Sequence, residues 1–211
     1  MEFNEKVKIG IMGGTFNPIH HGHLVAAGEA LNQFGLDKVI FIPSGDPPHK
    51  NASEEMIAEH RYLMTVIATS ANNNFFVSRI EIDRKGKSYT IDTVSELKKI
   101  YGESSDLYFI TGADAILEIL TWKKTEEIMK MCSFIAATRP GYNISRIQDL
   151  KERLFKKTKN NIEKIFVMEV PALAISSTDI RKRVKEKRPI DYLVPEGVSN
   201  YILKHGLYKQ S

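Results

Sequence analysis

The stretch that most constrains the fold is residues 7–34, VKIGIMGGTFNPIHHGHLVAAGEALNQF. The apolar run VKIGIM at its start is typical of a buried strand. Gly13 and Gly14 are expected to end this strand and to let the backbone come close to a bulky group. From about Gly22 the apolar residues recur at helical spacing. The stretch therefore predicts a strand, a glycine-bounded loop and a helix in succession.

Two histidines, His20 and His23, fall where this loop enters the first turn of the helix. The free N–H groups and the roughly half positive charge of a helix N-terminus suit a phosphate group. The same position disfavours a charged imidazole, so each histidine is expected to be neutral in the empty site. A bound polyphosphate would favour the charged form instead.

The local pattern has other interpretations. An ordinary strand-turn-helix unit would explain it without any ligand. Three histidines lie within four residues, with His21 between the other two, and this spacing is also compatible with a metal site. The cysteines or carboxylates of a closed zinc site are missing from this stretch. The glycine spacing fits neither a Walker P-loop nor a dinucleotide fingerprint.

The composition is that of a soluble globular protein. The 211 residues are expected to form one domain, with 42% hydrophobic and 27% charged residues. A net charge of +4 from 30 basic and 26 acidic residues suits an anionic ligand and does not indicate nucleic-acid binding. The single cysteine, Cys132, excludes an internal disulfide. The charged start MEFNEKVK does not resemble a signal peptide and no stretch could span a membrane, so a cytoplasmic protein is expected.

Strand-like and helical patterns alternate along the chain. Strands are expected at 7–12, 38–42, 75–82, 107–111, 132–138 and 164–170, and helices at 24–34, 54–71, 91–101, 144–158, 178–186 and 196–205. This alternation predicts an α/β fold, a Rossmann-like doubly wound parallel sheet with helices on both faces, over the single domain 1–211. Residues 175–211 form a small C-terminal helical part.

Ligands of such sheets bind beyond the carboxyl ends of the strands, which directs attention to the loops there. Two prolines stiffen the loop before His49 and Lys50, which is either a binding loop or a rigid surface loop. Thr90 is a helix cap or a ligand contact, and Asp114 either complements a helix start or binds a ligand. Trp122, the only tryptophan, is a core residue or a stacking platform.

A second motif, Ile175-Ser176-Ser177-Thr178-Asp179-Ile180-Arg181, opens a helix in the C-terminal part. Ser176 and Asp179 have the spacing of a capping box. Hydroxyl groups, free N–H groups and an arginine at one helix start also make a cradle for polyphosphate.

The first motif, GGTFNPIHHGHL, resembles the HxGH signature of the nucleotidyltransferase superfamily, in the form found in bacterial nicotinate mononucleotide adenylyltransferases. ISSTDIR resembles the ISSTxxR element that accompanies HxGH. PPHK, SYTIDT, TGADA and the tail from Arg188 to Tyr208 are similar to the same family. One departure is Asn17, where the family often has Asp.

The resemblance implies that the chain transfers an adenylyl group from ATP to nicotinate mononucleotide, forming deamido-NAD and pyrophosphate, with magnesium carried by ATP. The implied catalytic residues are His20, His23 and Arg181. The implied ATP-binding residues are Gly13, Gly14, Thr15, Phe16, Gly22, Gly112, Asp114, Ile175, Ser176, Ser177 and Thr178. The implied mononucleotide-binding residues are His49, Lys50, Tyr89, Thr90 and Trp122.

Three other functions stay open at this point. One is a related adenylyl or cytidylyl transferase that uses phosphopantetheine or nicotinamide mononucleotide. Another is a nucleotide sensor without catalysis, and the third is an RNA-binding module built on the basic helix 181–188, which lacks the expected aromatic strand motif. The sequence leaves the oligomeric state open, with a homodimer as one option.

Overall fold

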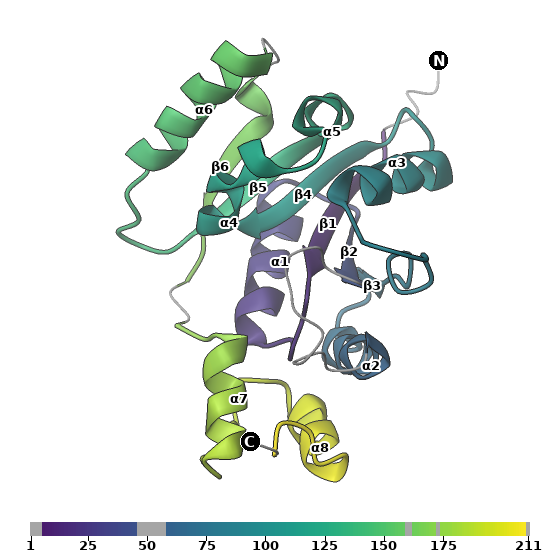
Figure 1. Ribbon diagram of the computed structural model, residues 1–211, viewed down its shortest axis with the longest axis vertical. Helices are drawn as coiled ribbons and strands as arrows, with labels where there is room; N and C mark the ends of the chain where they lie inside the picture. The colour runs from purple at the N-terminus through teal and green to yellow at the C-terminus, as the bar shows by residue number, and fades with distance from the viewer. Residues whose placement is uncertain (1–5, 46–57, 159–161, 172–173, 210–211) are drawn as a thin grey trace.

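A computed structural model describes residues 6–45, 58–158, 162–171 and 174–209, which form an α/β fold around a six-stranded sheet (Figure 1). All pairings in the sheet are parallel, and the strand order is β3-β2-β1-β4-β5-β6. The strands are β1 (Lys8–Gly14), β2 (Lys38–Pro43), β3 (Phe75–Val77), β4 (Asp106–Gly112), β5 (Cys132–Thr138) and β6 (Ile165–Glu169). The order reverses between β1 and β4, where an open sheet of this kind leaves a crevice for ligands.

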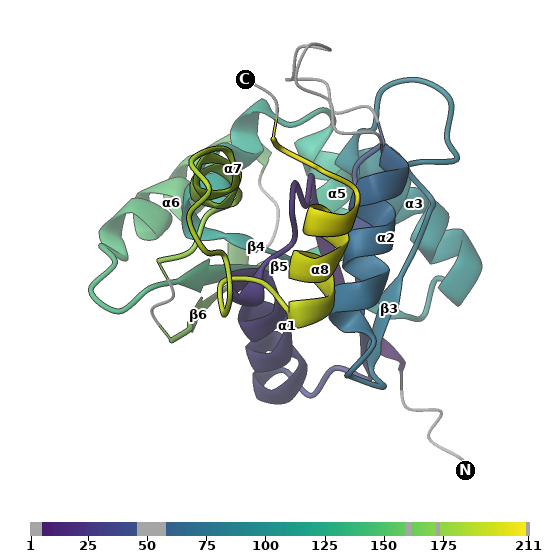
Figure 2. The ribbon, with the colours of Figure 1, turned by 90° about the horizontal axis from the view of Figure 1, so that it is seen from below.

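Helices cover both faces of the sheet, as predicted (Figures 1 and 2). They are α1 (His21–Gln33), α2 (Ala58–Thr69), α3 (Thr90–Tyr101), α4 (Ala113–Leu117), α5 (Thr125–Met131), α6 (Ser145–Thr158), α7 (Ser177–Lys185) and α8 (Glu196–Lys204), with single 3₁₀ turns at Ile119–Thr121 and Ile162–Lys164. None of the helices in the described part of the chain is long and apolar enough to cross a membrane.

The alternation of side chains along each strand produces two separate cores. In β2, Ile40 and Ile42 belong to one buried cluster, whereas Val39 and Phe41 belong to the other. Successive side chains of a strand point to opposite faces, so the strands other than the edge strand β3 contribute to both cores. In β3, Phe75 and Val77 pack on the second core, whereas Phe76 is exposed. The first core is closed by α3, α5 and α6, and the second by α1, α2, α7 and α8.

The C-terminal helices α7 and α8 lie together at one end of the molecule, beyond α1 (Figures 1 and 2). Helix α8 packs so closely on α2 that a Cβ atom on Gly197 would lie 2.6 Å from the side chain of Ile67. The same two helices are joined by a hydrogen bond of 2.8 Å between His60 Nδ1 and the hydroxyl of Tyr201. The C-terminal part is therefore packed onto the sheet domain, where it can take part in a site formed there.

Three expectations from the sequence were wrong in detail. β3 ends at Val77 and not at residue 82, because the chain turns after this edge strand and Asp83 N donates to the Arg79 carbonyl. β1 does not stop before the glycines, since Gly13 and Gly14 continue the pairing with β2. Helices α4 and α5 were missed, because 5 and 7 residues are too few to show a helical period.

Candidate active site

The loop after β1 leads the two histidines into the start of α1. His20 is the N-cap of α1 and His23 lies in its first turn. Their rings stack with centroids 3.7 Å apart, and the backbone N–H of His20 donates to His23 Nδ1 at 3.2 Å. Because His23 Nδ1 accepts this bond, the neutral ring carries its proton on Nε2.

The residues around the histidines fix the two rings. Phe16 is buried under His23, with its ring edge-on at a centroid distance of 5.1 Å. A Cβ atom on Gly22 would lie 3.0 Å from His20 Nδ1, so the glycine leaves room for the imidazole. His20 Nδ1 is buried, and no described residue makes a hydrogen bond to it. The phenylalanine and the glycine therefore restrict the ring positions.

Both histidines are neutral at pH 7, as predicted, although the main cause differs from the prediction. Burial lowers the pKa of His20 to about 4 and that of His23 to about 3. A neighbouring imidazole adds a smaller effect, from His21 on His20 and from His20 on His23. Removal from water, more than the field of the helix, is therefore what disfavours the charged rings.

The second motif lies against the same loop. Ser177 Oγ donates to the carbonyl oxygen of Pro18 at 2.8 Å, and Arg181 Nη1 donates to that of Asn17 at 2.8 Å. Ser176 is the N-cap of α7, and its Oγ accepts from the backbone N–H of Asp179 at 3.1 Å. The hydroxyls of Ser176 and Ser177 are thus engaged in hydrogen bonds within the protein. The groups that remain for a phosphate are backbone N–H groups of α7 and the other N–H donors of the Arg181 guanidinium.

The C-terminal tail adds a third contact to this loop. The hydroxyl of Tyr208 donates to Asn17 Oδ1 at 2.7 Å, and burial raises the pKa of this phenol. The backbone N–H of His21 donates to the carbonyl oxygen of Leu193 at 3.1 Å. An Asp at position 17 could accept the same bond from Tyr208, so the Asn found here keeps the contact.

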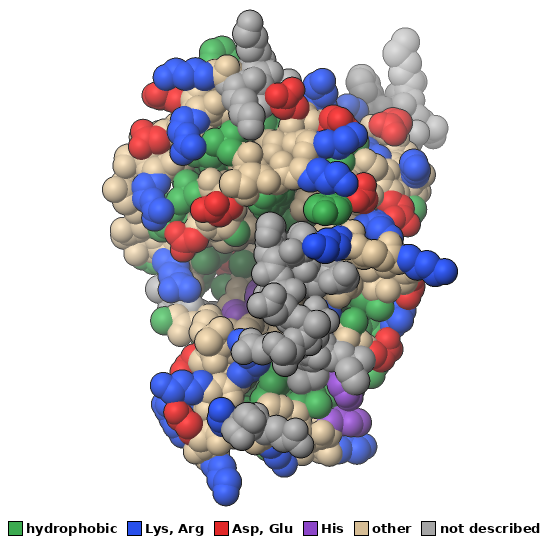
Figure 3. Space-filling model, in the orientation of Figure 1, with side chains coloured by type: hydrophobic (Ala, Val, Ile, Leu, Met, Phe, Trp, Pro, Cys, Tyr) green, Lys and Arg blue, Asp and Glu red, His purple; other side chains and the backbone are tan. Residues whose placement is uncertain are grey.

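A cavity of about 300 Å³ opens beside the histidines, at the point where the strand order reverses. Its lining comes from the carboxyl ends of β1, β4 and β5, from the first turns of α1 and from the start of the second motif. The lining includes Gly13, His20, His23, Gly112, Arg139 and Ile175. In the space-filling view, histidine surface is visible at the bottom of a hollow between the sheet and α7 (Figure 3).

Some predicted residues lie elsewhere. Asp114 does not line this cavity; its carboxylate is mostly exposed and lies 3.7 Å from Arg146 Nη1. Trp122 is partly buried and packs edge-on against Phe109 and Phe134 of the first core, at centroid distances of 5.5 and 6.2 Å. His49 and Lys50 lie outside the described residues.

The other residues predicted for the mononucleotide gather at the start of α3. Tyr89 is the N-cap of α3 and Thr90 its first residue, so the expected cap is displaced by one position. The Nζ atom of Lys123 lies 4.2 Å from the centre of the Tyr89 ring. Because Lys123 follows Trp122 directly, this contact brings two separate parts of the predicted mononucleotide site together.

Arg139 was missed by the sequence reasoning. It follows β5 directly, its side chain is exposed, and it lines the same cavity as His20 and His23. The signal that could have found it is its place after a strand, since the rule that singled out the other loops at the carboxyl ends applies equally to β5.

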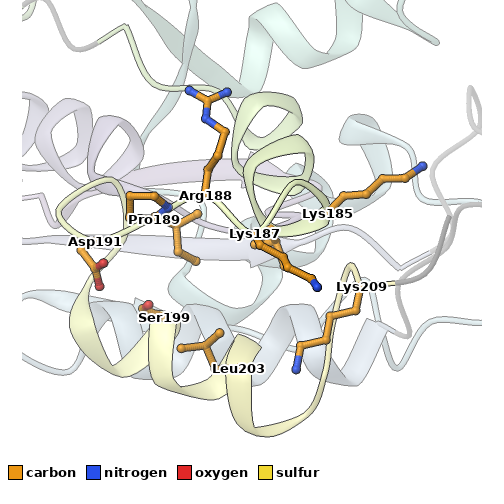
Figure 4. A pocket seen from close by; sticks show the side chains of 10 residues that line it. Lys185, Lys187, Arg188, Pro189, Asp191, Ser199, Leu203 and Lys209 are labelled. Atoms are coloured by element: carbon orange, nitrogen blue, oxygen red, sulfur yellow. The ribbon is translucent and has the colours of Figure 1, made fainter.

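A larger cavity, of about 610 Å³, lies between α7 and α8. Neither histidine of the first motif lines it, nor does Arg181. It faces the C-terminal end of α7, where Lys185, Lys187 and Lys209 surround it (Figure 4). Despite its size, this cavity is therefore not the candidate active site. The smaller cavity is lined by both histidines and by Ile175 of the second motif, whereas Arg181 lies outside its lining and reaches the histidine loop through Asn17.

The chain is similar to known proteins over nearly its full length. Residues 11–183 match the family model described as cytidylyltransferase-like. A protein of Thermoanaerobacter sp. (strain X514), named probable nicotinate-nucleotide adenylyltransferase, is 58% identical over 97% of this chain and 96% of its own. A protein of Moorella thermoacetica with the same name is 56% identical over 96% and 92%.

The fold is similar to that of solved structures. The nicotinic acid mononucleotide adenylyltransferase of Plasmodium falciparum, complexed with NaAD, superimposes with a TM-score of 0.74 at 22% identity, over 97% of this chain and 98% of that one. At this identity the match supports the fold alone.

Proposed function

This chain belongs to the nicotinate-nucleotide adenylyltransferases of the cytidylyltransferase-like family, and we propose that it transfers the adenylyl group of ATP to nicotinate mononucleotide, with pyrophosphate as the second product. The product is nicotinate adenine dinucleotide, the deamido form of NAD. The observation that carries the proposal is that the two motifs meet in space. Ser177 and Arg181 of the second motif donate hydrogen bonds to the loop that precedes His20 and His23. Both histidines line the cavity at the point where the strand order reverses.

The reaction needs no nucleophile from the protein. A phosphate oxygen of nicotinate mononucleotide attacks the α-phosphorus of ATP, and the bond from that phosphorus to the oxygen of the departing pyrophosphate breaks. Holding the two anions in line can supply roughly 7–11 kcal/mol of the barrier reduction. Preorganised hydrogen-bond donors then stabilise the charge that develops on the phosphates.

The two histidines supply such donors. His23 carries its proton on Nε2, because Nδ1 accepts the His20 N–H, and it can donate to a phosphate oxygen without first gaining a proton. The negative charge of bound ATP raises the pKa of both imidazoles, and proton uptake would turn them into stronger, charge-assisted donors. Their low starting pKa values leave the empty site without a buried charge.

The far phosphates of ATP are assigned to the start of α7 and to two arginines. N–H groups of the first turn and the guanidinium of Arg181 would bind an anion there, and Arg139 would add a cation from the lining of the cavity. Gly13, Gly14 and Gly22 would allow the nucleotide to approach the backbone. Thr15, Phe16, Gly112, Ile175 and Thr178 remain predicted contacts, whereas Asp114 would have to leave Arg146 to become one.

The side chains available as metal ligands determine how a divalent cation would be bound. The described residues contain no group of three His, Cys, Asp or Glu side chains that could hold a metal ion. Magnesium commonly binds through substrate phosphates and keeps several waters, so we assign the cation to ATP. Its contribution would be to neutralise the charge of the phosphates.

The nicotinate mononucleotide is assigned to the side of the site that holds Tyr89, Thr90 and Trp122, with His49 and Lys50 as further predicted contacts. Pyrophosphate release from ATP with a panel of acceptors tests the function. We expect turnover with nicotinate mononucleotide, a lower rate with nicotinamide mononucleotide and none with phosphopantetheine. Absence of turnover with every acceptor would refute the proposed activity.

A further inference from the structure

Arg61 is a buried cation that none of the predicted functions uses. It comes from α2 and is only 4% exposed. Its Nη1 donates to the carbonyl oxygen of Thr15 at 2.8 Å, and its Nη2 donates to those of Ser44 at 2.6 Å and Gly45 at 3.3 Å. A guanidinium so far removed from water is tolerated only when hydrogen bonds replace its hydration.

The carbonyl groups that Arg61 binds belong to two different loops. Thr15 follows β1 and begins the segment that ends at His20, whereas Ser44 and Gly45 follow β2. The backbone N–H of Ser44 also donates to the carbonyl oxygen of Gly14 at 2.9 Å. The planar fork of one arginine therefore ties together the carboxyl ends of two neighbouring strands, which the single ammonium group of a lysine cannot do in the same geometry.

The loop after β2 is held on its other side as well. A Cβ atom on Gly45 would lie 2.1 Å from the carbonyl oxygen of Glu81, so this backbone approach requires glycine. The carboxylate of Glu81 is buried and accepts a hydrogen bond of 2.7 Å from the hydroxyl of Thr93. Thr93 lies in the first turn of α3, the helix that has Tyr89 as its N-cap and Thr90 as its first residue. A chain of contacts thus runs from the histidine loop through Arg61 to the predicted mononucleotide side.

We infer that Arg61 is a positioning residue that sets the distance between the nucleotide loop at Thr15 and the mononucleotide side at the start of α3. The inference rests on the proposed function, because it concerns the relative placement of the two substrates of that reaction. Each substrate can still bind to its own loop without Arg61. In-line attack requires that the two loops hold the two substrates at the correct distance and angle. A misplacement of about 1 Å can lower the rate roughly 100-fold.

The experiment compares Arg61→Lys with Arg79→Lys. The control variant makes the same arginine-to-lysine change at Arg79, which is partly exposed. The side chain of Arg79 pairs with Glu59 and Asp83 and contacts neither the loop at Thr15 nor the loop at Ser44. Binding of ATP alone and of nicotinate mononucleotide alone is measured by calorimetry, kcat is measured with both substrates, and circular dichroism establishes a temperature at which every variant is folded. We expect kcat of R61K to fall roughly 100-fold with both dissociation constants nearly unchanged, and R79K to behave as the wild type.

Two results would overturn the inference. Wild-type kcat in folded R61K would assign Arg61 to stability alone, and a weaker affinity for ATP that accounts for the whole loss would assign it to the nucleotide loop alone. If R61K does not fold, the isosteric Thr93→Val decides, since it breaks the far end of the chain and must lower kcat without weakening ATP binding; an unchanged kcat refutes the inference. Turnover by the wild type in the same assay tests the proposed function separately.

Discussion

The Nη1 group of Arg181 donates a hydrogen bond to the carbonyl oxygen of Asn17 over 2.8 Å, although the two residues lie 164 positions apart. The arginine predicted to bind phosphate therefore also fixes the turn before the histidines. Because the guanidinium has five N–H donors, it can keep this bond and still present others to a ligand.

Replacing Arg181 by Lys should lower kcat/KM for ATP by about 10- to 100-fold, which corresponds to about 1.4–2.7 kcal/mol. The lysine keeps the charge but cannot hold Asn17 and a phosphate in the geometry of a planar fork. Steady-state kinetics with varied ATP measure the effect. Lys182→Ala is the control at the neighbouring position, since Lys182 is exposed and its ion pair with Glu186 is long, at 3.8 Å. An R181K enzyme with wild-type kcat/KM would contradict the role.

Loss of either histidine should lower kcat by roughly 100- to 1,000-fold, the usual effect of removing one preorganised donor. His20→Ala and His23→Ala are compared with His21→Ala, whose side chain lies between the two in sequence and has no role in the proposed mechanism. Circular dichroism and unfolding by urea confirm that the variants are folded. Turnover near the wild-type rate in H20A and H23A would exclude the histidines from the chemistry.

The pKa values of these histidines also predict how stability depends on pH. In the unfolded chain a histidine titrates near pH 6.5, whereas folding lowers the pKa to about 4 for His20 and about 3 for His23. The unfolded state therefore binds more protons below pH 6.5, and the free energy of unfolding falls as the pH is lowered from there toward 4 and 3. The slope approaches about 1.4 kcal/mol per pH unit for each such proton.

His23→Gln tests this dependence, because glutamine does not titrate. Urea unfolding of the wild type and of H23Q is measured between about pH 5 and pH 7, above the range in which most carboxylates titrate. We expect a shallower slope for H23Q. Parallel slopes for the two proteins would show that the His23 imidazole is not buried in its neutral form.

Trp122 should affect the mononucleotide more than ATP. Trp122→Ala is expected to raise KM for nicotinate mononucleotide several-fold more than KM for ATP, because the next residue, Lys123, contacts the ring of Tyr89 on the predicted mononucleotide side. It should also destabilise the fold by about 2–3 kcal/mol, since the ring packs on Phe109 and Phe134. Trp122→Phe keeps much of the packing and separates the two effects. Equal changes in both KM values would mean that Trp122 is only a core residue.

The sequence predicted the parts of the site that are contiguous in the chain. The strand-loop-helix around His20 and His23 and the helix start at Ser176 follow from local spacing and capping chemistry, and both are confirmed as local structures. Even the neutral state of the histidines could be predicted in direction, although its main cause, burial, depends on residues from the rest of the fold.

What the sequence could not predict depends on tertiary neighbours. Nothing in the string around Arg61 indicates that its guanidinium is buried between two loops, because an isolated arginine in a helix pattern is usually on the surface. The position of Asp114 outside the cavity is equally invisible, since the cavity is lined by segments that lie far apart in the chain. The hydroxyl of Ser177 could not be assigned to Pro18 before the two motifs were seen together.

Two glycines, Gly45 and Gly28, differ in whether the structure leaves room for a side chain. A Cβ atom on Gly45 would lie 2.1 Å from the carbonyl oxygen of Glu81, whereas one on Gly28, inside α1, would meet nothing within 4 Å. Gly45→Ala should therefore destabilise the protein by about 1–3 kcal/mol or more, because backbone must move to relieve the clash. Gly28→Ala should stabilise it by about 0.5–1 kcal/mol, because alanine loses less conformational entropy in a helix. Urea unfolding measures both changes.

The G45A substitution should also lower kcat, since the carbonyl oxygen of Gly45 accepts a hydrogen bond from Arg61, which joins the two loops. The G28A substitution should leave kcat unchanged. A G45A protein as stable and active as the wild type would show that the loop after β2 has room to shift and does not set the spacing of the substrates.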